Sequence, residues 1–70
     1  MPTIDVVRRA AKSLGFLDEA GQLLKLDSLG VIDLVLELER ATRVRIPLAS
    51  LGGEAFESVE RLAEALDQVR

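Results

Sequence analysis

The sequence predicts an all-α fold, a small four-helix bundle with three longer helices and one short helix. The chain is 49% apolar but only 3% aromatic, so its core must be built from Leu, Val, Ile and Ala, a mixture typical of helical bundles. Apolar residues recur at steps of three and four near both ends of the chain. Between them, residues 26–39 are predicted to form one helix around which the rest packs. At this length, residues 1–70 are expected to form a single domain with a modest core.

The first helix is expected over residues 4–14. Thr3 is a good N-cap residue, Asp5 suits the first turn, and Gly15 is placed to end the helix in a left-handed conformation. Apolar side chains recur along one face, at Ile4, Val7, Ala11 and Leu14. Basic side chains form the opposite strip, which we interpret as a solvated face, at Arg8, Arg9 and Lys12. Residues 16–26 then form a connection that apolar side chains pin to the bundle, at Phe16, Leu17, Leu23 and Leu24.

The central helix divides into three sectors when its residues are placed at about 100° each. A wholly non-apolar arc is expected to face water, with Gly30, Asp33, Glu37 and Arg40. A wide apolar arc is expected to meet the neighbouring helices, with Val31, Leu34, Val35, Leu38 and Ala41. The third sector is an apolar strip with two polar interruptions, made of Ser28, Leu29, Ile32, Leu36 and Glu39. A plain core stripe would not contain those polar groups.

Two residues compete to start this helix. Asp27 and Ser28 are both good N-caps, and only one side chain is needed at that position. One of them is therefore surplus to capping. For an isolated serine at a helix start, an idle role would be the ordinary interpretation.

The segment after the central helix is expected to be short and irregular. Val44 and Ile46 suggest an extended stretch, and Pro47 fits the first position of a brief helix over residues 48–51, which Gly52 and Gly53 end. Phe56 anchors the following loop. The last helix is expected to be capped by Ser58, with a buried side made of Val59, Leu62, Ala63, Leu66 and Val69.

Composition excludes several kinds of chemistry. The chain has no Cys and no His, so it has no disulfide, no thiolate or imidazole metal site and no Ser-His triad. Its net charge of −3 argues against non-specific nucleic-acid binding. No apolar run approaches the roughly 20 residues of a membrane span, and no signal sequence opens the chain. We therefore expect a cytoplasmic protein without a metal, a membrane or a nucleic acid as partner.

The central helix and its flanks resemble the acyl carrier proteins. The family signature is Asp-Ser-Leu at the start of the second helix, and here it is Asp27-Ser28-Leu29. An Ile-Pro pair closes the following loop in that family, and Pro47 of Arg45-Ile46-Pro47 comes nineteen residues after Ser28, the family spacing. With the helix between them and Glu39 near its end, the resemblance covers residues 24–47.

The resemblance implies that Ser28 is esterified by a phosphopantetheine arm, whose thiol carries an acyl group as a thioester. A helix N-terminus favours a phosphodiester, because it presents unpaired N–H groups and the positive end of the helix dipole. Without a His to act as base, the chain does not modify itself, so a phosphopantetheinyl transferase must be one partner. The chain is then a carrier and not an enzyme.

The resemblance also implies that the second helix meets the acyl-loading and acyl-processing enzymes of fatty acid, polyketide or related biosynthesis. Acidic residues are expected to steer basic partner surfaces, at Asp27, Asp33, Glu37 and Glu39. Apolar residues beside Ser28 are expected to supply the contact, at Leu29, Ile32 and Leu36. The carrier itself is expected to be a monomer.

Two alternatives keep the fold and change the function. The cargo can be an aminoacyl or peptidyl group, such as D-alanine, because some of those carriers also use an Asp-Ser pair. The apolar strip can instead serve an unmodified helical adaptor. A carboxylate-dependent enzyme is a poor third hypothesis, because acids on a helix surface usually stay solvated at ordinary pKa.

Overall fold

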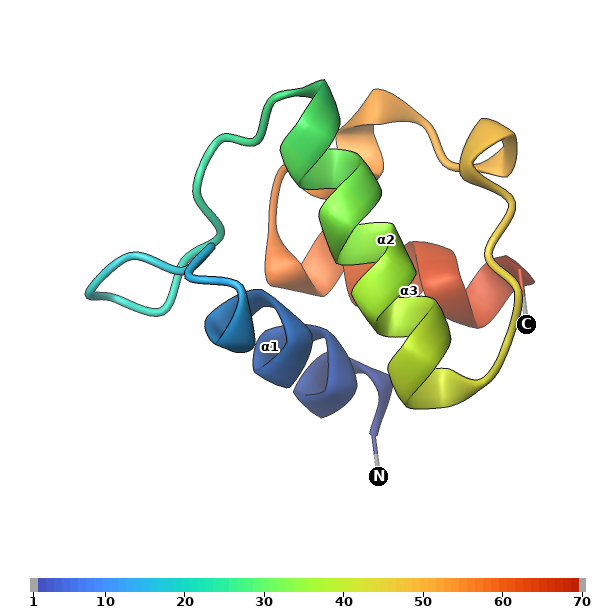
Figure 1. Cartoon of the computed structure of the whole chain (residues 1–70), viewed down its shortest axis with the longest axis horizontal. Helices are drawn as coiled ribbons and strands as arrows, with labels where there is room; N and C mark the ends of the chain where they lie inside the picture. The colour runs from blue at the N-terminus through green and yellow to red at the C-terminus, as the bar shows by residue number, and fades with distance from the viewer. Residues whose placement is uncertain (1, 70) are drawn as a thin grey trace.

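Three α-helices connected by irregular segments make up the fold, in a computed structural model that describes residues 2–69 (Figure 1). The helices are α1 (Thr3–Ser13), α2 (Ser28–Thr42) and α3 (Val59–Val69), with two 3₁₀ turns, η1 (Leu48–Ser50) and η2 (Gly53–Phe56), between the last two. Across the described residues, β pairing is confined to one isolated bridge between Leu17 and Leu23. None of the helices in this part of the chain has the length and apolar character needed to cross a membrane. The all-α prediction is confirmed.

The core lies where α1 packs on α2 and α3, and η2 covers another part of α3. The largest fully buried side chains are all aliphatic: Leu34, Leu38, Leu62, Leu66, Val7 and Val59. The predicted buried sides of α1 and α3 are confirmed, with Ile4, Leu14 and Val69 partly buried at their edges. Aliphatic packing across three helices therefore holds α2 in place.

The start of α1 differs from the prediction. Pro2 stands at the N-cap position without a side-chain bond, and Thr3 already lies in the helix. The Thr3 hydroxyl instead donates to Asp67 Oδ1 at 2.5 Å, which ties α1 to the last turns of α3. The capping role predicted for Thr3 is wrong, because its side chain is used between helices. The predicted stop is confirmed, since Gly15 has φ +76°.

Two residues of α2 differ from the prediction in their exposure to solvent. Gly30 is buried and not solvated, because the preceding loop folds back over it: a Cβ there would lie 3.3 Å from Leu26 Cβ. Ala41 is exposed and not in the core, because it lies at the edge of the α1–α2 contact. Leu34, Val35 and Leu38 are buried as predicted, and Val31 is partly buried. In the preceding connection, Leu24 is exposed and does not pin the loop.

The end of α2 turns the chain sharply back along the bundle. Arg43 takes a left-handed conformation, φ 58°, and its N–H bonds the Glu39 carbonyl. The returning extended segment is fixed by the Glu39 side chain, whose Oε2 accepts from the Ile46 N–H at 2.6 Å. The predicted brief helix is only the three-residue turn η1, and Gly53 begins η2 where we expected an end. A fourth helix is therefore not confirmed.

Candidate functional site

Ser28 is the first residue of α2, a helix that starts at the upper edge of the molecule in Figure 1, and it is exposed. The cap is Asp27, whose Oδ1 accepts from the Gly30 N–H at 2.8 Å. Within residues 2–69, the Ser28 hydroxyl takes part in no hydrogen bond. Of the two residues that could cap the helix, Asp27 therefore does so, and Ser28 keeps a free hydroxyl.

The backbone at the start of α2 offers free N–H groups to an anion near Ser28. The N–H groups of Gly30 and Val31 bond Asp27, whereas those of Ser28 and Leu29 have no acceptor in the described part of the chain. Free N–H groups at the start of a 15-residue helix, with the positive end of its dipole, favour a phosphate on the adjacent oxygen. Lys25 lines the same surface groove as Ser28 and adds a cation near it. The residues present therefore fit a phosphodiester on Ser28.

A groove opens beside Ser28, between the first turns of α2 and the η1–η2 segment. Aliphatic side chains dominate its walls, and three of them are largely exposed for their type: Leu24 at 42%, Ile32 at 43% and Leu48 at 41%. Leu51 and Phe56 lie deeper, partly buried against the core. Sequence reasoning missed this groove, because two of its exposed residues come from irregular segments on either side of α2.

A second apolar surface runs along the outside of α2. Leu29 is 71% exposed and Leu36 is 54% exposed, with Ile32 between this strip and the groove. The predicted partner residues Leu29, Ile32 and Leu36 are therefore open to contact. Asp27 and Asp33 are exposed beside them.

The other two predicted acids are engaged within the chain. Glu37 pairs with Arg40 at 3.5 Å and its side chain is only 28% exposed. Glu39 holds the Ile46 N–H. They lie nine and eleven residues beyond Ser28, about 14 and 17 Å along the helix axis. The structure thus brings Asp27, Leu29, Ile32 and Asp33 together with Ser28, and leaves Glu37 and Glu39 nearer the other end of α2.

Comparison with known proteins identifies the family. A family model described as "Phosphopantetheine attachment site" matches residues 4–66. The chain belongs to this phosphopantetheine-attachment family. Its members are carriers, not catalysts, that bind phosphopantetheine covalently on a serine and interact with phosphopantetheinyl transferases and processing enzymes.

The related proteins include carriers of one particular cargo. A D-alanyl carrier protein of Streptococcus uberis is 31% identical over 45 residues, which cover 64% of this chain and 57% of the relative. A D-alanyl carrier protein of Streptococcus pyogenes serotype M5 is 27% identical over the same shares of the two chains. The match thus spans a little over half the length of these relatives. No solved structure matches the chain significantly.

Only one of the four serines in this phosphopantetheine-attachment domain has a free hydroxyl at the start of a long helix. Ser13 donates to the Ala10 carbonyl at the end of α1. Ser58 is used as the cap of α3, where its Oγ accepts from the Arg61 N–H at 3.0 Å. Ser50 ends the three-residue turn η1, which is too short to present a helix N-terminus. Ser28 alone has the geometry that suits the attachment.

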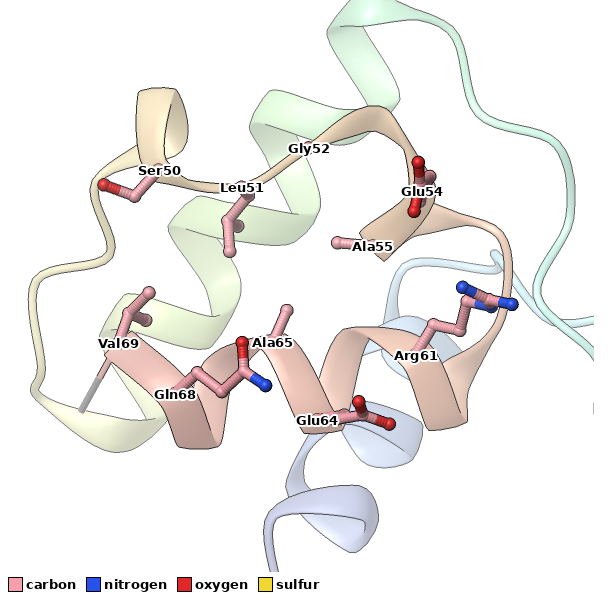
Figure 2. A pocket seen from close by; sticks show the side chains of 10 residues that line it. All are labelled: Ser50, Leu51, Gly52, Glu54, Ala55, Arg61, Glu64, Ala65, Gln68 and Val69. Carbon is pink, nitrogen blue, oxygen red and sulfur yellow. The ribbon is translucent and has the colours of Figure 1, made fainter.

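A second hollow lies between the η1–η2 segment and α3 (Figure 2). Figure 2 shows Leu51 and Ala65 pointing into it from opposite sides, with Arg61, Glu64 and Gln68 along α3. Arg61 also pairs with Glu57 at 3.8 Å. Ser28 is not part of the lining of this hollow.

Proposed function

We propose that Ser28 bears the phosphopantetheine arm and that the chain presents an acyl group, held on that arm, to successive partner enzymes. The observation that carries the proposal is the division between Asp27 and Ser28. The neighbouring carboxylate caps the helix, so the serine hydroxyl is exposed and can be esterified without loss of the cap.

The chemistry is divided between the arm and the chain. The arm supplies a flexible tether that ends in a thiol, to which an acyl group is joined as a thioester. The chain supplies a fixed anchor: α2 holds Ser28 Oγ at the start of the helix, and the free N–H groups of Ser28 and Leu29 favour the phosphate charge. The chain has no His or Cys side chain to promote attack on the thioester.

Partner contact is proposed at the exposed side of α2 near Ser28. Leu29 and Ile32 offer apolar area, while Asp27 and Asp33 attract basic surfaces and raise the rate of encounter. Cytoplasmic location and a monomeric state stay predictions from the sequence.

For the cargo, we propose an aminoacyl group, with D-alanine as the first candidate. The support is the similarity to proteins that are named D-alanyl carriers. A fatty or polyketide acyl group is the second candidate, and the apolar groove beside Ser28 favours it.

Intact mass spectrometry tests the attachment. Incubation with a phosphopantetheinyl transferase and coenzyme A should add one arm to the wild type and none to Ser28→Ala. Far-UV circular dichroism should give the same helix content for both, because the lost hydroxyl makes no bond in the described structure. Ser50→Ala is the matched control and should load fully. Loading of Ser28→Ala, or failure of Ser50→Ala alone, would show that the site is assigned to the wrong serine.

A separate measurement tests the cargo. The transferase can place an alanyl arm or an octanoyl arm on Ser28 from the matching coenzyme A thioester, and the hydrolysis of each thioester can then be followed. An aminoacyl carrier should leave both cargoes equally exposed to water, so each should hydrolyse at the rate of its own free coenzyme A thioester. Selective protection of the octanoyl thioester, lost in Ile32→Asp, would favour the fatty acyl candidate instead.

A further inference from the structure

A groove runs between α1 and the second half of α2, at a distance from Ser28. In Figure 1, α1 lies alongside the lower part of α2, and its first turn is close to the end of that helix. The groove is lined from both helices by Val6, Arg9, Ala10, Lys12, Ser13, Glu37 and Ala41. None of these residues lines the groove beside Ser28.

The floor of this α1–α2 groove is apolar. Ala10 is 5% exposed and Val6 is partly buried, while Ala41 is exposed where the sequence predicts core. An alanine is small, so at this edge the two helices leave a shallow trough between them. Val6 packs in part against the core, and the rest of its apolar surface, with that of Ala41, stays open in this trough.

The rim on α1 carries two cations that the fold does not use either. Arg8 pairs with Asp5 and with Glu60, at 3.8 Å each. Arg9 and Lys12 have no carboxylate within 4 Å anywhere in residues 2–69. Across the groove, Glu37 is paired with Arg40. Two unneutralised cations therefore stand on one side of an open apolar trough, in a chain whose net charge is −3.

We propose that this α1–α2 groove is a second docking surface, which binds an acidic, amphipathic segment of a partner protein. Aliphatic side chains of that segment lie on Val6, Ala10 and Ala41, and its carboxylates meet Arg9 and Lys12. An anionic membrane fits less well, because the surface is concave and Glu37 lies on its other rim.

The position of the groove separates this surface from the attachment site. Glu37 and Ala41 lie nine and thirteen residues after Ser28, about 14 and 20 Å along α2. A partner held there leaves Ser28, the exposed Leu29 and the Ser28 groove free for a second protein. The chain can then be retained by one protein while its arm visits another, which raises the effective concentration of the cargo.

Backbone amide NMR on the full chain tests the proposal with a defined probe. The probe is a synthetic helical peptide of about 15 residues with Leu on one face and Glu beside it, and the control peptide has Gln in place of Glu. The acidic peptide should shift amides in residues 6–13 and 37–41, and the Gln peptide should bind more weakly. No binding of the acidic peptide, or shifts centred on Leu29 and Ile32, would overturn the proposal.

Charge reversal separates this surface from general electrostatics. Arg9→Glu combined with Lys12→Glu should weaken peptide binding at least about tenfold. Lys25→Glu combined with Arg61→Glu changes the net charge equally at exposed positions outside the groove, and should retain binding within about twofold. Equal losses in the two double variants would overturn the proposal.

Two further measurements distinguish a protein partner from a membrane, and the α1–α2 groove from the Ser28 site. Vesicles of phosphatidylcholine with added phosphatidylglycerol should not retain the chain, and retention that requires Arg9 and Lys12 would assign the surface to a membrane instead.

The Arg9→Glu, Lys12→Glu variant should accept the arm at the wild-type rate, because its substituted positions lie away from Ser28. A variant that lost loading and peptide binding together would show one continuous surface, against the proposal.

Discussion

Leu34 and Leu36 lie two residues apart on α2, yet Leu34 is fully buried and Leu36 is 54% exposed. Leu34 and Leu38 face the core that α1 and α3 close, whereas Leu29 and Leu36 face outward. Burial of a large aliphatic side chain stabilises a fold by about 1.5 to 3 kcal/mol. Folding therefore accounts for the two buried leucines, Leu34 and Leu38. It gives no structural reason for the two exposed ones, and exposed apolar side chains of this kind are typical of an interaction surface.

The largest change in stability is expected when one leucine from each face of α2 is truncated to alanine. Leu34→Ala should lower the free energy of unfolding by about 2 to 5 kcal/mol, because it leaves a cavity in the core. Leu36→Ala should change it by less than about 1 kcal/mol. Urea denaturation followed by circular dichroism measures both. Equal losses would mean that Leu36 is covered in solution and that the outer strip is not free.

Glu39 sharpens the comparison, because the sequence places it with the partner residues and the structure uses it inside the chain. Glu39→Ala should destabilise the fold by about 1 to 3 kcal/mol, since the part-buried Ile46 N–H loses its acceptor. Glu39→Gln keeps an acceptor oxygen and should cost less than about 1 kcal/mol. Chemical denaturation measures both variants. If Glu39→Ala unfolds like the wild type, its carboxylate is available to partners after all.

Asp27 offers a smaller effect at the other end of α2. Asp27→Ala removes the bond to the Gly30 N–H and should cost about 0.5 to 2 kcal/mol, whereas Asp27→Asn keeps a capping oxygen and should stay close to the wild type. Thermal unfolding of the two variants and of Ser28→Ala gives the comparison. A Ser28→Ala loss as large as that of Asp27→Ala would show that the hydroxyl shares the cap.

The smallest effect concerns the approach of the transferase. At about 0.15 M salt the Debye length is about 8 Å, so a partner at Ser28 senses mainly the charges of the first turns of α2. Asp33→Lys should slow association at low salt and less at high salt, and Arg43→Glu, just past the end of α2 and about 22 Å from Ser28 along the helix axis, should do little. Stopped-flow rates across a salt series measure both. Equal slowing by Arg43→Glu would extend the recognition surface past the end of α2.

Periodicity predicted the helices and most of the core, because a single face repeats every three or four residues. It misplaced Gly30 and Ala41, since a wheel gives an angle and not the position of neighbouring segments: a loop covers Gly30, and no helix reaches across Ala41. The left-handed stop at Arg43 was missed because no glycine or asparagine marks it, and the turn η2 was missed because Gly53, which begins it, was expected to end the preceding brief helix. At the site, the sequence predicted a surplus polar residue at the helix start, and only the bond from Gly30 to Asp27 shows which one it is.

The separation of cap from free hydroxyl also has an evolutionary consequence. A gene copy that lost the Ser28 hydroxyl would still encode Asp27, and so a capped α2 with the same outward leucines. Selection on folding alone does not protect Ser28, because the fold makes no use of its hydroxyl. Descendants of such a carrier are therefore free to discard the chemistry and keep the shape, and a lineage of unmodified binding proteins can arise from it by a single substitution.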